Sequence, residues 1–356
     1  MRTQVLVQSL HIQTRRDSFA QWLACVNLAV LTKDANTHMA HYLNDEQRAR
    51  IRRHLGEATH GEWQTWLVTA MVYGGWLAAL LFHDALTLLP STVILILCSV
   101  WYMSLQHEFM HGHPTRHAWL NKMLGYAPLA VWFPYTLYRE THMRHHQDEN
   151  LTYPGLDPES HYIAPEVWRR SGRAMRALYR IRKTFWGRLA IGPLLAICGT
   201  LGSSGRRIVN GDLRELPMWL THGALLAAML YGVQRWTGMP WWYYLLCVAY
   251  PALSLAMVRS YFEHRAADDC KHRIVINEAG PLMRLLFLNN NYHLVHHDLP
   301  HLPWYLIARV YWADRNAYLS RCNGFLVHGY LDLMRRHGFT PIDEPPHPLA
   351  RDRSRQ

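Results

Sequence analysis

The chain has 356 residues, of which half are hydrophobic, and its formal net charge at pH 7 is +11. Long apolar blocks alternate with basic segments, a distribution typical of a membrane protein with several spans and not of a soluble globular domain. The charge would suit a nucleic-acid binder, but no helix-turn-helix, zinc-finger or RNA-binding motif is present, so we expect no nucleic-acid partner. The six cysteines form no CxxC pair, which argues against a thiolate metal site.

Residues 1–62 are predicted to form a cytosolic N-terminal segment. Within it, Phe19 to Leu31 is an apolar stretch of 13 residues. A helix that crosses the hydrocarbon core needs ~20 apolar residues. We therefore predict that this stretch is a helix lying in the membrane interface.

Four longer apolar blocks are predicted to be transmembrane helices, at residues 63–82, 86–105, 216–235 and 241–262. Each is close to the ~20 residues that cross ~30 Å of hydrocarbon. The connection between the first two blocks is three residues long, and the connection between the last two contains Gly238 and Pro240. Both are typical of tight turns. The predicted fold is an all-α integral membrane protein with four transmembrane helices in two hairpins.

The polar segments predict the orientation of the chain. Residues 106–215 are basic, and their apolar stretch Leu189 to Leu201 is short enough to predict a second interfacial helix. The two hairpin connections hold one Lys or Arg between them. By the positive-inside rule, both termini and the central region lie in the cytoplasm, at the cell membrane if the source is bacterial. We divide the chain into the N-terminal segment, a membrane domain at 63–310 and a cytosolic tail at 311–356.

Histidines occur in three boxes next to these spans. The boxes read HEFMH at residues 107–111, HMRHH at 142–146 and HLVHH at 293–297, and His264 follows the fourth block. On a helix, positions i, i+3 and i+4 share one face, so each box presents its imidazoles in one direction. Neutral imidazole is the commonest metal ligand, and nine are too many for one ion and suitable for two. We predict a cytosolic helical cap with two metals held by His107, His111, His142, His145, His146, His264, His293, His296 and His297.

Four further residues are candidates for orienting these ligands: Glu108, Glu263, Asn290 and His113. Side chains that hydrogen-bond a metal-bound histidine fix the orientation of its ring. The two glutamates could equally be solvated acids, and His113 could replace a ligand of the first box. His222 is the one histidine deep in a predicted span, where a buried and hydrogen-bonded ring is expected.

Two other functions fit part of this pattern. The first box has the HExxH spacing of zinc metalloproteases, in which Glu108 would be the base. That reading leaves both HxxHH boxes unexplained. A histidine-rich transporter or metal-binding scaffold would need polar groups deep inside the spans, and the spans contain almost no charge.

Over about residues 63–310 the chain resembles the membrane fatty acid desaturase family. The resemblance is carried by HEFMH, by HMRHH some thirty residues later, and by NNNYHLVHHDLPHLPWY after the fourth span. It implies a di-iron centre, which spacing alone does not, because imidazole also suits Zn, Cu and Ni. It further implies that O2 is a co-substrate and that a double bond is introduced into a fatty acyl chain of a lipid or acyl substrate.

The resemblance leaves the reaction and the electron source open. The glutamates of HEFMH and YFEHR are similar to those of membrane alkane hydroxylases, so a hydroxylase or ketolase acting on an acyl, alkane or other lipid is the alternative. Many family members carry a fused haem domain with an HPGG motif, which this sequence lacks. We therefore expect a separate electron donor, such as a ferredoxin or rubredoxin with its reductase.

Overall fold

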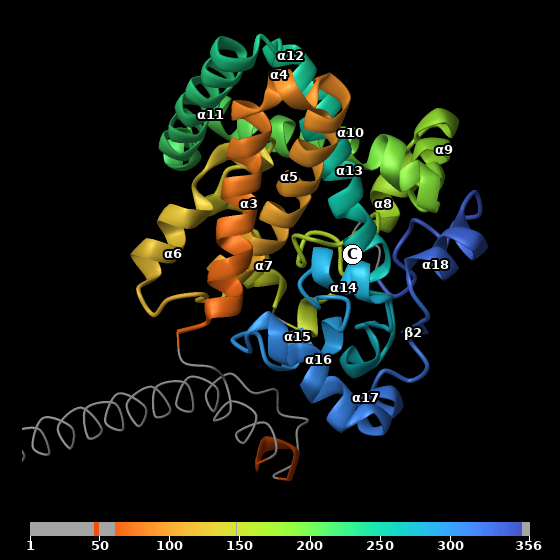
Figure 1. The fold of residues 1–356 in the computed structure, drawn as a ribbon. Coiled ribbons are helices and arrows are strands. Elements are labelled where there is room, and N and C mark those ends of the chain that lie inside the picture. Colours follow the sequence, from red (N-terminus) through yellow and green to blue (C-terminus); the bar gives the residue numbers. More distant parts are fainter. Residues whose placement is uncertain (1–45, 50–60, 147, 351–356) are drawn as a thin grey trace, which may run out of the picture.

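The computed structural model describes residues 46–49, 61–146 and 148–350 (Figure 1). The predicted interfacial helix at Phe19 to Leu31 lies outside the described residues. The fold is mostly helical, as predicted. Both hairpin turns lie at one end of the molecule, near α4 and α12, and α15, α16 and α17 lie at the other end (Figure 1).

The first hairpin consists of α3 (Trp63–Leu81), α4 (His83–Leu86) and α5 (Leu88–Met110). The predicted second span ended at residue 105, but α5 continues to Met110, so the first histidine box begins inside the helix. Residues 107–110 include no proline or glycine that would end the helix. The helix ends where Gly112 adopts a φ of +97°, a conformation that favours glycine.

The second hairpin consists of α11 (Leu216–Thr237), α12 (Trp241–Tyr243), a π-helix η4 (Tyr244–Ala249), α13 (Tyr250–Arg259) and the 3-10 turn η5 (Ser260–Phe262). Gly238 ends α11 with a φ of +69°. Pro251 is the second residue after the π-helix, and because it has no N–H it cannot complete the α-helical ladder there. This is a physical reason for the wider helical turn before it.

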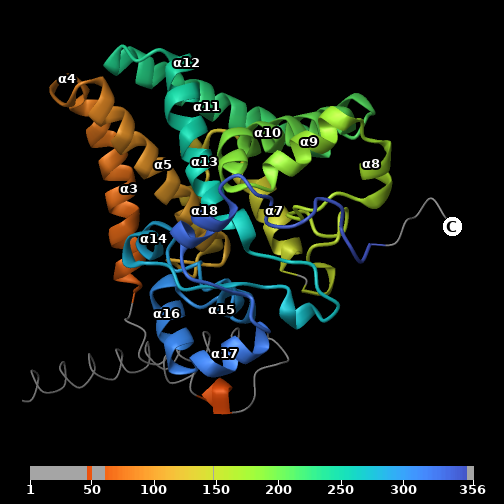
Figure 2. The same cartoon turned by 90° about the vertical axis from the view of Figure 1, so that its right-hand side faces the viewer.

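A fifth helix is long and apolar enough to cross a membrane. It is α10 (Phe185–Val209), whose apolar middle is the stretch predicted to lie in the interface. The helix is longer than predicted because it continues through small residues such as Gly202 and Ser203, which lie beyond the apolar stretch. Among the described residues, five helices therefore meet the length and composition of a span, against four predicted. In Figure 2, α10 runs across the direction of α3 and α5. Its interfacial placement stays a prediction.

The segment between the first two boxes is tied to the spans. It contains α6 (Ala118–Gly125), η1 (Pro128–Ala130) and α7 (Tyr135–His145). The hydroxyl of Tyr102 donates to the carbonyls of Gly125 (2.8 Å) and Ala127 (2.7 Å). The ring of His222 hydrogen-bonds the Val131 carbonyl at 2.7 Å, so this histidine is buried and satisfied, as predicted. Non-helical backbone inside a membrane bundle requires such partners, and they fix the start of α7.

The remaining elements are short. They are η2 (Asp148–Asn150), α8 (Pro165–Arg170), α9 (Arg173–Arg182), η3 (Leu213–Glu215), η6 (Cys270–His272), α14 (Pro281–Leu286), α15 (His293–Asp298), α16 (Trp304–Ala313), α17 (Arg315–Arg321) and α18 (Tyr330–His337). They do not all lie at the histidine end, because α9 and η3 pack against α10. Two short parallel strands, β1 (Ile276–Asn277) and β2 (Leu326–Val327), join the chain after the fourth span to its C-terminal part. Buried Val295, Ile307 and Tyr311 belong to the hydrophobic core at the histidine end.

Candidate metal centre

Eight of the nine predicted histidines form two compact groups. In each group, one ring nitrogen from every residue lies within 4.8 Å of the others. The first group is His107, His111, His142 and His296, and the second group is His145, His264, His293 and His297. The ninth, His146, lies between them. Its Nε2 is 3.0 Å from His142 Nε2 and 3.1 Å from His296 Nε2, and its ring stacks on His297 with 4.4 Å between centroids.

Each HxxHH box contributes to both groups. In α15, positions i and i+4 (His293 and His297) belong to the second group, while position i+3 (His296) belongs to the first. In the α7 box, His142 belongs to the first group and His145 to the second. In both boxes the separated positions are three residues apart, which places their rings about 60° apart around the axis of a helix with ~3.6 residues per turn. The sequence predicted the nine residues but not this division.

The donor atoms fit metal cations. His142 Nε2 lies 3.1 Å from His111 Nε2, and His145 Nε2 lies 2.9 Å from His264 Nε2. At most one hydrogen can lie between two facing ring nitrogens, so converging Nε2 atoms bring lone pairs together. Within the described part of the chain, the buried Nε2 of His107 has no hydrogen-bond partner. A cation in each group would satisfy these nitrogens, and buried polar atoms need such partners.

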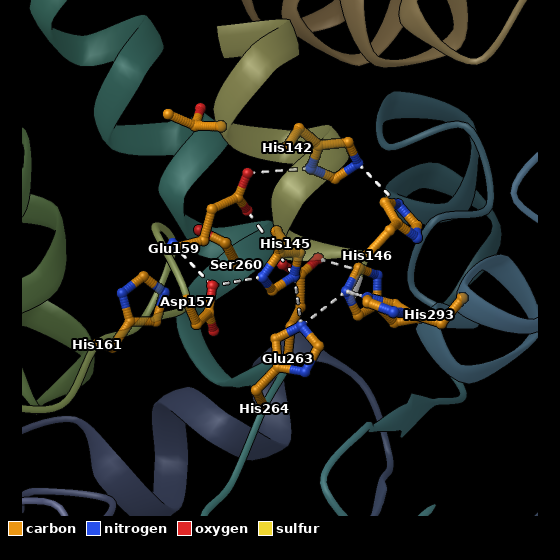
Figure 3. A network of polar contacts seen from close by, with 12 residues as sticks. His142, His145, His146, Asp157, Glu159, His161, Ser260, Glu263, His264 and His293 are labelled. Carbon is orange, nitrogen blue, oxygen red and sulfur yellow. Dashed lines mark hydrogen bonds and ion pairs between the residues drawn. The ribbon is translucent and has the colours of Figure 1, made fainter. Parts of the chain in front are cut away.

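Two carboxylates hold rings of the second box (Figure 3). Asp157 lies 2.8 Å from His145 Nδ1, and Glu159 lies 3.0 Å from His142 Nδ1. An acceptor at Nδ1 keeps the hydrogen there and leaves Nε2 as the donor to a metal. Sequence reasoning missed both acids. The sequence feature that could have indicated them is the position of the two acids in DPES at 157–160, shortly after HMRHH.

The four residues predicted to orient ligands take different positions. Asn290 Oδ1 lies 3.2 Å from His293 Nδ1, and Glu263 lies 3.7 Å from the same nitrogen. Glu108 is 3.5 Å from His107 Nδ1 and accepts a hydrogen bond from the Trp304 N–H at 3.2 Å. His113 is paired with Glu62 at 2.7 Å and belongs to neither histidine group.

The environment keeps most of these rings neutral. Burial, followed by repulsion from neighbouring rings, holds the pKa values of His111, His146, His264, His293 and His296 well below their usual range. Neutral imidazole is the form that binds metals.

His145 differs from these rings because acids lie beside it. Burial lowers the pKa of His145, but Glu159 and Asp157 raise it more, to about 9. A metal at this position must therefore displace a proton, which couples metal binding to proton release. The same contacts act on the acid: burial raises the pKa of Glu159, but His145 and His142 bring it below its usual range.

A family model supports the same reading of the site. The fatty acid desaturase model matches residues 84–324, about two thirds of the chain. The chain belongs to the fatty acid desaturase family. A comparison with individual curated proteins found no match. In this desaturase-family chain the match covers all nine histidines, which are the eight of the two groups and His146, and it excludes the last thirty or so residues.

Family membership implies an oxidoreductase that depends on iron and acts on a lipid or acyl substrate in a membrane context. The five apolar helices agree with a membrane protein. The metalloprotease alternative loses its support, because the HExxH histidines share their group with His142 and His296. Its supposed base, Glu108, is turned toward the Trp304 backbone.

Proposed function

We propose that this protein is an O2-dependent di-iron oxidase that introduces a double bond into a fatty acyl chain. The observation that carries the proposal is the pair of buried histidine groups lying side by side, bridged by His146. Each group offers four imidazole nitrogens, a donor set that suits iron. Iron itself comes from the family and not from the donor set.

The nine histidines would hold the two ions, with Asp157, Glu159 and Asn290 fixing ring orientation. Bound iron would supply the activation of O2 and the removal of hydrogen from an unactivated methylene group. In desaturation, two hydrogens leave neighbouring carbons, and O2 is reduced to two water molecules with two electrons and two protons. The electrons would come from a separate ferredoxin or rubredoxin and its reductase.

The protein's own contribution would be placement. Buried ring nitrogens and the surrounding apolar core exclude water from the centre. The way the protein holds the acyl substrate would also determine whether the second hydrogen is lost or an oxygen atom is inserted. A misplacement of the substrate by ~1 Å can change a reaction rate ~100-fold. We place this centre and both termini on the cytoplasmic face, because the hairpin connections at the opposite end carry almost no positive charge.

The test combines metal analysis with lipid profiling. Wild-type protein in detergent should contain two irons per chain, and His296→Ala should lose iron sharply because His296 belongs to the first group and contacts His146. Cells that express the wild type with an electron donor should accumulate acyl chains that have lost two hydrogens, and cells with the variant should not. A single zinc unchanged by the substitution would refute the proposal. An acyl chain that has gained one oxygen would assign hydroxylation instead.

A further inference from the structure

The C-terminal residues 341–349, called here the C-terminal strap, lie beyond the family match and pack near the histidines. The strap pairs with the segment that follows the second box. The N–H of Ile163 donates to the Pro345 carbonyl at 2.8 Å, and the N–H of His347 donates to the Ile163 carbonyl at 3.0 Å. These bonds form a short parallel bridge between Ile163 and Pro346. The strap is therefore a fixed part of the fold.

One chain of contacts leads from the strap to His145. His347 is 2 % exposed, and its Nδ1 accepts a hydrogen bond from the Leu349 N–H at 3.1 Å. In the neutral ring the hydrogen is then on Nε2, which donates to the hydroxyl of Thr152 at 3.0 Å. The N–H of Thr152 donates to one oxygen of Asp157 at 2.9 Å. The other oxygen of Asp157 binds His145, a member of the second histidine group.

Within this series of contacts, Thr152 is the residue with a strained backbone. Its φ is +73°, in the left-handed region that a β-branched residue rarely adopts. Such a conformation persists only where surrounding contacts hold it. Two buried contacts hold Thr152, one from its hydroxyl to His347 and one from its backbone N–H to Asp157. The strap thus holds the backbone that presents Asp157 to the metal centre.

A second chain of contacts leads from the strap to His264. Asp343 accepts a hydrogen bond from the hydroxyl of Tyr162 at 2.5 Å and forms an ion pair of 2.6 Å with the buried ammonium of Lys183. The same hydroxyl of Tyr162 accepts from the N–H of Ala266 at 2.9 Å. Ala266 is two residues after His264 in the chain, and His264 also belongs to the second group.

We propose that the C-terminal strap positions the ligands of the second histidine group, with His347 and Tyr162 as the positioning residues. This inference rests on the proposed function in so far as both groups bind metal. The strap reaches the first group by a longer route, because Asp157 accepts from the Glu159 N–H and Glu159 then binds His142. The metal of the second group therefore depends on the strap more strongly than the metal of the first.

The test uses His347→Phe in the full-length chain. Phenylalanine keeps a ring to stack on Tyr153, whose centroid lies 4.5 Å away, but it cannot donate to Thr152. His347→Gln retains an Nε2 donor, and the exposed Glu344→Gln in the same strap is the matched control. Iron affinity is measured by titration, and each site is followed by Mössbauer spectroscopy on isotopically enriched iron.

We expect His347→Phe to weaken iron binding about tenfold, the lower end of the ~10–100-fold effect of substituting residues that support metal ligands. One of the two iron signals should fade, His347→Gln should restore it, and Glu344→Gln should not change it. Tyr162→Phe, which removes the second chain of contacts, should weaken the same signal. Equal loss of both signals, or no loss in either variant, would overturn the proposal. Because the readout is metal binding, a wild type that loads two irons but oxidises no lipid would refute only the proposed function.

Discussion

Substitution of Asp157 by Asn is the most direct test of how the carboxylates support the centre. Asp157 is 4 % exposed, and its side chain accepts three hydrogen bonds. The donors are His145 Nδ1 at 2.8 Å, the Thr152 N–H at 2.9 Å and the Glu159 N–H at 2.8 Å. Asparagine has the same shape but one amide group. In either orientation its NH2 faces at least one of these donors, and the negative charge is lost.

The size of the effect follows from these contacts. A hydrogen bond to a charged group contributes about 1.5–3 kcal/mol, and the loss of one leaves a buried donor without a partner. A free-energy difference of about 1.4 kcal/mol is a factor of ten in affinity. We therefore expect Asp157→Asn to weaken iron binding by about ten- to a hundredfold, which agrees with the usual effect of changing a residue that hydrogen-bonds a metal ligand.

Glu159→Gln is the matched comparison. Glu159 hydrogen-bonds His142 of the first group, whereas Asp157 hydrogen-bonds His145 of the second. Mössbauer spectra of the two variants should lose different iron signals, and Asp157→Asn should lose the one that also fades in His347→Phe. If both variants bound two irons as tightly as the wild type, or if both lost the same signal, our assignment of these acids to separate metal sites would be wrong.

Two further predictions concern the bundle. Gly187→Ala should lower the melting temperature in detergent by the equivalent of about 1–3 kcal/mol or more, because its Cβ would lie 1.9 Å from the Ile181 carbonyl oxygen. Gly199→Ala, with nothing within 4 Å, should be neutral or stabilising, and equal behaviour of the two variants would contradict the packing. His222→Ala should cost about 1–3 kcal/mol, since the buried Val131 carbonyl loses its donor. It should leave the iron content unchanged, and a loss of iron would show that His222 does more than hold the segment before α7.

The apolar periodicity and spacing of the sequence predicted many of the long helices. The helices α3 and α11 begin at the residues expected from the apolar blocks, because a run of about twenty apolar letters leaves little choice of structure. The predicted end of the second span was five residues early, since apolar content falls at Gln106 while the helix continues. The length of α10 was also missed, because glycine and serine inside a helix lower the apolar signal without ending the helix.

The site was predictable where the ligands repeat at helical spacing, and at His264, which follows the fourth apolar block. The HxxHH boxes indicated which histidines come together, because positions three and four apart share a face. Asp157, Glu159 and His347 have no such pattern. Their roles depend on how the chain folds back over α7, and His347 lies about two hundred residues from its partner Thr152. Contacts of that separation are not encoded in any local spacing.

The division of each HxxHH box between two groups has a consequence for the geometry of the centre. Because α7 and α15 each carry ligands of both groups, the separation of the two sites is set by the offset between positions on a helix and not by a flexible loop. Helices position ligands more precisely than loops do. The loop that carries Asp157 and the C-terminal strap then act on ring orientation and tautomer. Changes in these elements should alter the affinity of one site while the relative placement of the two sites is kept.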